Sequence, residues 1–187
     1  MSHERRPSGA YYQDRTGLLS QGDVFLDVPL AYPTPADSIV FDEEDADAGR
    51  RFLSGPFETG PAILTTPTCS MRSQGGEADY AHPVRTLVPL RPVEELLEAG
   101  ILDSSKGGLA QKRDSLLNYM FFPGDPSVGL VDSLALLYMP VTLHHEMVVA
   151  NRVSQLTQDA ACQLQKKLVW FSSSLLLERR EFDPPMD

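Results

Sequence analysis

Apolar residues occur in this chain as short segments closed off by prolines and glycines, and this punctuation limits the fold more than any other sequence feature. Ala62–Thr66 is the clearest case, because its apolar and β-branched residues lie between Pro61 and Pro67. Segments of this length are typical of strands, whereas a globular helix usually needs roughly ten residues or more. The pattern therefore predicts a domain built mainly from short β-strands.

Four further segments are predicted to be strands. Asp23–Leu30 alternates with a period of two, so its even-numbered residues are predicted to share one buried face. Its Pro29 favours an edge position or a strand end. Ser133–Thr142 is apolar on both faces, which predicts one central strand. Thr86–Leu90 and Asn118–Phe122 complete the predicted set.

Two segments are predicted to be helices. Pro92–Gly100 begins with proline and ends with glycine, an arrangement typical of a short helix. The C-terminal helix is predicted to begin after Thr157, whose hydroxyl can cap it, and to end near Arg179. Apolar residues recur in it at steps of three and four, which places them on one core-facing side. They are Ala161, Leu164, Leu168, Phe171 and Leu175.

A chain of 187 residues fits a single domain, here predicted to span residues 20–178. Residues 1–19 are polar and are predicted to form a flexible N-terminal arm. An acidic loop insertion is predicted around residues 33–60, and its part at Asp37–Gly49 is expected to be exposed and poorly ordered because like charges repel. Residues 179–187 are predicted to be a tail.

Composition excludes several classes of protein. Lys and Arg number 16 against 26 Asp and Glu, and the resulting formal charge of -10 disfavours general binding to RNA or to anionic lipid. No apolar segment approaches the roughly 20 residues that span a bilayer, and the polar N-terminus predicts no signal peptide. The two cysteines, Cys69 and Cys162, form no metal or disulfide motif. These features predict a cytoplasmic protein without a membrane partner.

Several short motifs, taken in order, resemble the MazF/PemK family of toxins. The opening Gly-Asp-Val strand, a Pro-hydrophobic second strand, a Val-Pro-Ile strand, a late Asp-Ser-hydrophobic strand and the entry to the last helix each have a counterpart here. The counterparts are Gln21–Val24, Pro61–Leu64, Val88–Leu90, Gly129–Leu137 and Arg152–Thr157.

The resemblance implies an α+β protein: a small SH3-like antiparallel β-barrel with a C-terminal amphipathic helix. It also implies a homodimer, an antitoxin-like protein partner and an RNA-cleaving ancestry. Two positions depart from the family pattern. Gly60 stands where the family's catalytic Arg is expected, and Arg91 follows the Val-Pro-Leu segment where the family has Thr or Ser. These departures favour a relative that binds a protein or RNA without cutting RNA.

The alternative interpretation is an enzyme, either an endoribonuclease or a Cys-dependent hydrolase. The turn Thr65–Ser70 carries four hydroxyls and a thiol directly after a predicted buried strand. Cys69 would be the nucleophile, assisted by Thr68 and by a histidine base, of which His82 is the first choice. His144 and His145 are further candidates for the base. The simpler interpretation is a small cysteine packed in a threonine-rich turn.

Other charged residues suggest weaker possibilities. Arg91 would hold a phosphate or stabilise a developing negative charge, and surface ion pairing is the alternative for it and the other arginines. Asp23 and Asp132 would either form a carboxylate pair or begin strands. His144-His145 would rarely bind one metal ion, because adjacent strand residues point to opposite faces. No cofactor or metal is predicted. The remaining arginine candidates are Arg72, Arg85, Arg113 and Arg152.

Overall fold

The computed structural model of this chain describes residues 11–14, 17–31, 40–42, 52–54, 57–71, 83–102 and 118–182. Its strands are β1 (Tyr12–Gln13), β2 (Asp23–Ala31), β3 (Val40–Asp42), β4 (Phe52–Ser54), β5 (Phe57–Leu64), β6 (Val84–Pro92), β7 (Tyr119–Phe122), β8 (Ser133–Leu136), β9 (Val141–His144) and β10 (Arg152–Leu156). Its helices are α1 (Thr68–Met71), α2 (Val93–Glu98), the 3₁₀ turn η3 (Pro126–Val128), α4 (Glu146–Val149) and α5 (Gln158–Phe182).

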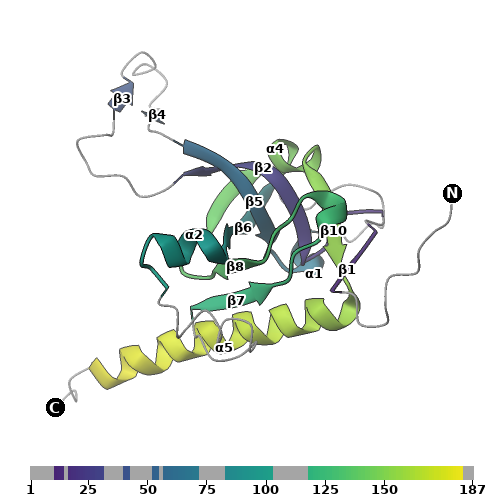
Figure 1. The fold of residues 1–187 in the computed structure, drawn as a ribbon. Helices are drawn as coiled ribbons and strands as arrows, with labels where there is room; N and C mark the ends of the chain where they lie inside the picture. The colour runs from purple at the N-terminus through teal and green to yellow at the C-terminus, as the bar shows by residue number, and fades with distance from the viewer. Residues whose placement is uncertain are drawn as a thin grey trace, which may run out of the picture.

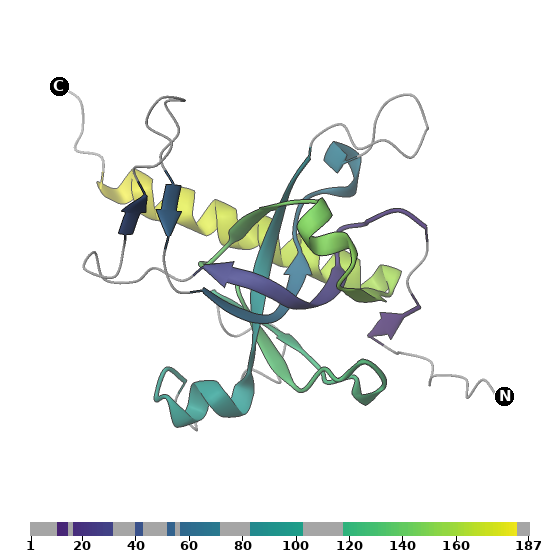
Figure 2. The ribbon, with the colours of Figure 1, turned by 90° about the horizontal axis from the view of Figure 1, so that it is seen from above.

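Eight strands form one strongly bent antiparallel sheet that curls into an open half-barrel (Figure 1). The strand order is β1-β10-β2-β5-β6-β8-β7, and β9 pairs with the first half of β6. β3 and β4 form a separate two-stranded sheet that stands away from the half-barrel in both views (Figure 2). The predicted fold class, a mainly antiparallel β domain with a C-terminal helix, is confirmed.

Strands β2, β5, β6 and β7 and the short helix α2 lie where the sequence predicted them, whereas β1, β3, β4 and β10 were not predicted. Ser133–Thr142 differs, because the predicted single strand is divided into β8 and β9. Both parts pair with β6, β8 at Leu90–Pro92 and β9 at Val84–Leu87. The turn between them allows the chain to follow the bend of β6. All four residues of β8 are buried, as the two-sided apolar pattern predicted.

A bulge in β2 changes which of its residues face the core together. The register with β5 shifts between Phe25 and Val28, and Asp27 adopts a left-handed backbone with φ of 53°. The extra residue puts Phe25 and Val28 in the same core cluster, whereas Val24 belongs to the opposite one. The prediction that the even-numbered residues share a face is therefore wrong, since a bulge reverses the alternation. Pro29 pairs with Thr59 of β5, but it lies beyond the part of β2 that pairs with β10. This position agrees with the predicted place at an edge or a strand end.

Two apolar clusters cover the two faces of the central strands. The first lies between the sheet and α5, and the second lies beneath α1 and α4. A third, smaller cluster fixes α2 against β7 and β8 through Leu96. Within the first cluster, Leu164 is fully buried, while Ala161, Leu168 and Phe171 pack against its edge. The predicted core-facing side of the C-terminal helix is confirmed for these four residues, and the side chain of Leu175 lies outside the described part.

Side chains of the first strand bring the two ends of the sheet together. The Tyr12 hydroxyl donates a 2.7 Å hydrogen bond to the carbonyl of Pro123, which directly follows β7. The ring of Tyr11 meets Phe122 of β7 edge-on, with 5.7 Å between ring centroids. β1 and β7 are the two terminal strands of the order. These contacts therefore join the two edges of the open half-barrel, although no strand ladder connects them.

The boundaries predicted from the sequence need three changes. The described part of the expected arm at 1–19 is packed into the domain, because Tyr11, Tyr12 and Leu19 are buried. The expected insertion around 33–60 includes β3, β4 and the start of β5. The helix α5 continues to Phe182, beyond the predicted end near Arg179. The expected disorder of Asp37–Gly49 falls largely outside the described residues.

Thr157 caps α5 as predicted, although its hydroxyl is a distant 3.5 Å from the backbone N–H of Ala160. None of the helices in the described part of the chain combines the length and the apolar character that crossing a membrane would require.

Replacing Tyr12 with Phe should destabilise the domain by about 1–2 kcal/mol, because the Pro123 carbonyl loses its donor while the ring still packs. Urea unfolding followed by circular dichroism measures this change. Tyr138→Phe is the matched control, since this tyrosine is 45% exposed and its loss should cost less than about 0.5 kcal/mol. Equal effects of the two substitutions would contradict the closing role of Tyr12.

Candidate functional site

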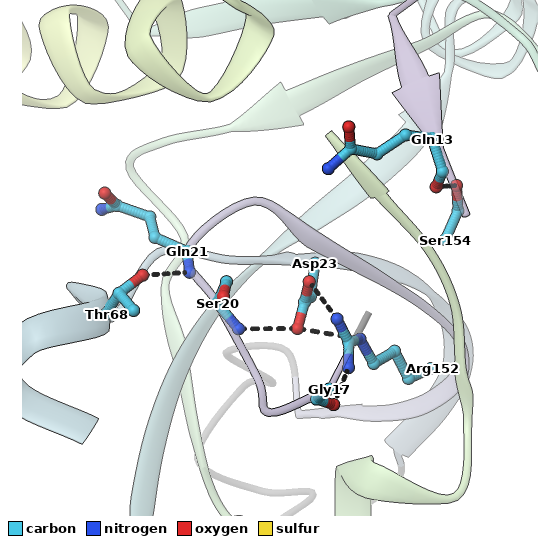
Figure 3. Close-up of polar contacts among 8 residues, drawn as sticks. All are labelled: Gln13, Gly17, Ser20, Gln21, Asp23, Thr68, Arg152 and Ser154. Carbon is cyan, nitrogen blue, oxygen red and sulfur yellow. Dashed lines mark hydrogen bonds and ion pairs between the residues drawn. The ribbon is translucent and has the colours of Figure 1, made fainter. Parts of the chain in front are cut away.

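The threonine-rich turn that follows β5 is held by two hydrogen bonds from Gln21 and by one within the turn. The backbone N–H of Gln21 donates to the Thr68 hydroxyl at 2.9 Å, as Figure 3 shows. The Gln21 side-chain amide donates to the Thr65 carbonyl at 2.7 Å. Ser70 donates its hydroxyl to the Pro67 carbonyl at 2.9 Å. Gln21 is therefore the residue that joins the turn to the start of β2.

The hydroxyls of Thr65 and Thr66 both reach β6. Each donates to the carbonyl of Thr86, at 3.1 and 3.4 Å, and the Thr66 hydroxyl accepts a 2.7 Å bond from the Thr86 N–H. The turn thereby continues the pairing of β5 with β6 after the strand ends at Leu64. These hydroxyls stabilise the local fold, which is a structural use of residues that the sequence suggested for chemistry.

Cys69 lies in α1 and is exposed to solvent. The interpretation of Cys69 as a small cysteine buried in a threonine-rich turn is thus wrong, since Met71 is the residue of α1 that is buried. In the described part of the chain, no hydrogen bond or ion pair joins Cys69 to a histidine. His82, the first choice for a catalytic base, lies outside the described residues, so its place relative to Cys69 remains a prediction.

His144 and His145 lie at the end of β9 and in the turn that leads to α4. Their rings are tilted by 33° with centroids 5.5 Å apart, and His144 Nδ1 is 3.7 Å from a Glu146 carboxylate oxygen. Among the described residues, no three His, Cys, Asp or Glu side chains lie together where they could hold a metal ion.

Arg91 lies at the other end of the central strands. Its guanidinium is 2.8 Å from the Glu58 carboxylate and 3.1 Å from that of Glu95. The ladder between β5 and β6 ends with Ala62 opposite Pro89, and Arg91 pairs with Leu134 of β8 instead. The contact with Glu58 brings Arg91 to β5, the strand that carries Gly60.

The sequence-predicted residues thus fall into two groups. Thr68 and Cys69 follow the end of β5, in the turn whose Thr65 donates to Thr86 of β6. Arg91 is five residues further along β6, which is about 17 Å in an extended strand. A single substrate group could not contact Arg91 and Cys69 together at hydrogen-bonding distance.

Asp23 and Arg152 form the main buried ion pair among the described residues (Figure 3). Arg152 Nη2 donates to Asp23 Oδ1 at 3.0 Å, and Nε lies 2.9 Å from Oδ2. The carboxylate also accepts the Ser20 N–H at 2.8 Å. Arg152 Nη1 donates to the Gly17 carbonyl at 3.0 Å, so one side chain ties β10 to β2 and to the segment before it.

Burial raises the pKa of Asp23 to about 6, because removal from water penalises the carboxylate more than the Ser20 N–H and Arg152 recover. The carboxylate pair of Asp23 with Asp132 is not formed. Asp132 instead accepts the Gly124 N–H at 2.6 Å in the turn before β8, which is the strand-start role that the sequence also allowed.

Of the other arginine candidates, one is buried and two lie outside the described residues. Arg85 on β6 is fully buried, where the sequence suggested surface pairing, and its Nη1 donates to the Val84 carbonyl at 2.7 Å. Arg72 and Arg113 lie outside the described residues. Sequence reasoning missed Gln21, whose role depends on a contact with a turn 44 residues away.

It also missed the exposed pair Val169 and Trp170 on α5, which are 64% and 46% exposed. Their positions off the core-facing side of the helix were a usable signal.

No protein-family model matches this chain, and no curated protein matches it. The resemblance to MazF/PemK toxins therefore stands as a proposal.

A pH titration tests the burial of Asp23. Its carboxyl group should titrate with a midpoint near 6 instead of the ordinary 3.8. The NMR chemical shift of the carboxyl carbon measures this midpoint. The folded state then binds the proton more tightly than the unfolded state. The difference in the free energy of unfolding between wild type and Asp23→Asn should therefore shift in favour of wild type as the pH falls from about 6 to about 4.

Arg152→Met provides the comparison for this titration. Arg152 lowers the pKa of Asp23, so its loss should move the midpoint above the wild-type value. A wild-type midpoint below 4, or one that Arg152→Met leaves in place, would contradict this description of the pair.

Proposed function

We propose that this chain is a divergent MazF/PemK-like barrel protein, of the toxin–antitoxin or defence type, that binds a protein partner and does not cut RNA. The proposal includes a homodimer in the cytoplasm and an antitoxin-like protein as the partner. The observation that carries it is the ion-pair cluster around Arg91, at the place where the resemblance would put RNA cleavage.

Cleavage of RNA in this family's manner needs a cation at the scissile phosphate, because negative charge develops there in the transition state. Gly60 supplies none. Arg91 is the neighbouring cation, but Glu58 and Glu95 both contact it. Two carboxylates around one guanidinium leave a local excess of negative charge, which disfavours a phosphate. The formal charge of -10 acts in the same direction at longer range.

A proton acceptor is also needed beside the attacking oxygen. Arg91 occupies the position where the family has Thr or Ser, and a guanidinium is always charged, so it cannot accept a proton. Thr65 and Thr66 belong to the other end of the strands and are bonded to Thr86. These features support binding instead of catalysis.

One observation favours a second candidate function. Cys69 is exposed on α1, between Thr68 and Ser70, so its thiol is accessible to a substrate. A Cys-dependent hydrolase would use this thiol as its nucleophile and would need a histidine base such as His82.

Incubation of the purified protein with long structured and unstructured RNAs should give no sequence-specific cleavage. Gel electrophoresis of the RNA measures the outcome. Specific cleavage that disappears in Arg91→Ala would contradict the proposal and would place the catalytic cation on β6. Cleavage that survives Arg91→Ala but disappears in Cys69→Ala would favour the enzyme at the threonine-rich turn. Glu94→Ala is the control, since Glu94 is exposed and is the neighbour of Glu95 in the same helical turn.

A further inference from the structure

β7 is the last strand of the sheet, and among the described residues no strand pairs with its outer edge (Figure 1). In an antiparallel ladder, the backbone groups of alternate residues point to the neighbouring strand, and those of the residues between them point away. The Leu137 N–H donates to the Asn118 carbonyl at 3.0 Å, which fixes the alternation between β7 and β8. The even-numbered residues of β7 therefore face β8, whereas Tyr119 and Phe121 direct their N–H and C=O groups outward.

The contact that closes the half-barrel stops short of these outward groups. The Pro123 carbonyl, which is the next outward acceptor along the chain, accepts the Tyr12 hydroxyl at 2.7 Å. Among the described residues, no hydrogen bond reaches the outward backbone groups of Tyr119 and Phe121. These two donors and two acceptors form the open half of a ladder, and a further strand is the structure that completes one.

The side chains along this edge are apolar. Tyr119 and Phe121 are half-buried and pack against the cluster that holds α2. The ring of Tyr138, which is 45% exposed, meets the ring of Tyr119 edge-on with 5.7 Å between centroids. A strand added to β7 would place alternate side chains beside these rings, and pairs of aromatic with apolar or aromatic residues stabilise neighbouring strands. Alternate residues of the added strand should therefore be apolar.

A second open edge, on β9, is less suited to pairing. The His145 N–H donates to the Pro83 carbonyl, so by the same alternation the outward residues of β9 are Thr142 and His144. Both are exposed, and Pro140 directly precedes the strand. A proline at an edge is one of the ways in which proteins prevent unwanted pairing, whereas β7 contains neither a proline nor a charged residue.

The charge around β7 selects the kind of strand that would bind. Two carboxylates lie in the turn that follows the strand, because Asp132 accepts the Gly124 N–H at 2.6 Å and Asp125 comes directly after Gly124. The whole chain has a formal charge of -10. A basic segment is attracted to such a surface, whereas a second copy of this chain would bring the same excess of negative charge. Charge complementarity therefore favours a basic partner at this edge.

We propose that the outer edge of β7 binds an extended segment of a partner protein as an added strand, with apolar residues at alternate positions and Lys or Arg near Asp125 and Asp132. In this mode of binding, main-chain hydrogen bonds supply affinity and the alternate side chains supply specificity. The inference rests on the protein partner of the proposed function and names the surface and the kind of segment that it recognises.

Amide hydrogen exchange, followed by NMR, tests whether the edge is open. In the free protein the amides of Tyr119 and Phe121 should exchange at least about tenfold faster than those of Met120 and Phe122, which face β8. Slow exchange of the two outward amides would overturn the proposal. Protection that grows with protein concentration would show that a second copy occupies the edge, and protection independent of concentration would show that the chain itself covers it.

A mixture of synthetic peptides of about eight residues, the length of an ordinary strand, serves as the probe. Val, Ile, Phe or Tyr alternates in each peptide with Thr, Glu, Lys or Arg. Peptides retained by the immobilised full-length protein, identified by mass spectrometry, should be enriched in Lys and Arg. They should slow exchange at Tyr119 and Phe121 by about tenfold or more. Retention of no peptide, or of peptides that protect Thr142 instead, would overturn binding at β7. The second result would leave the protein partner of the proposed function in place.

Phe121→Pro is the decisive variant, because proline removes an outward N–H and leaves the groups that face β8 in place. It should weaken the affinity of a retained peptide by about tenfold or more, measured by fluorescence anisotropy. Thr142→Pro is the matched control, since it removes an outward N–H from the edge of β9, and it should change the affinity less than about twofold. Where circular dichroism shows that Phe121→Pro is unfolded, Phe121→Lys replaces it, because a positive charge at the edge should repel the basic peptide to a similar extent. Equal affinities of the β7 variant and Thr142→Pro would overturn the proposal.

Discussion

The buried pair of Asp23 and Arg152 is the interaction on which the arrangement of the half-barrel depends. It joins residues 129 positions apart, with both side chains almost completely removed from water. Burial of the pair has a desolvation cost that its attraction does not fully recover, which the raised pKa of Asp23 reflects. The effect of the pair is therefore to specify the register of β10. Any register of β10 that separates the two groups would leave a charge buried without its partner, and that state is strongly disfavoured.

Around this pair, the turn Ser20–Asp23 connects three strands. Gly22, with φ of 91°, donates its N–H to Leu64 of β5 and accepts the N–H of Leu156 of β10. Residues with a side chain rarely adopt this φ, and a Cβ at Gly22 would lie only 3.0 Å from Leu156 Cδ1, so glycine is favoured here. Gln21 extends the same connection to the threonine-rich turn. Residues with the chemistry of an active site thus support the frame.

Features encoded by neighbouring residues could be predicted from the sequence, and features that depend on distant contacts could not. The apolar spacing of α5 and the segments of β5, β6 and β7 follow from local pattern. The bulge at Asp27 is fixed by Asn151, whose carbonyl and side chain bind β2 from across the sheet. The division of Ser133–Thr142 depends on the bend of β6. The structural role of Thr65 and Thr66 depends on their hydrogen bonds to Thr86, a residue distant in the sequence. Without that contact, the clustering of hydroxyls in the sequence suggested a chemical role instead.

A double-mutant cycle at pH 8 tests most directly whether the frame depends on this pair. Asp23→Leu and Arg152→Met should each destabilise the fold by several kcal/mol, about 3–5 for the loss of one partner of a buried pair. The double variant should lose less than either single variant, because neither charge is left alone, and the coupling should reach at least about 2 kcal/mol. Single effects that add within about 0.5 kcal/mol in the double variant would show that the two residues act independently and would contradict this account.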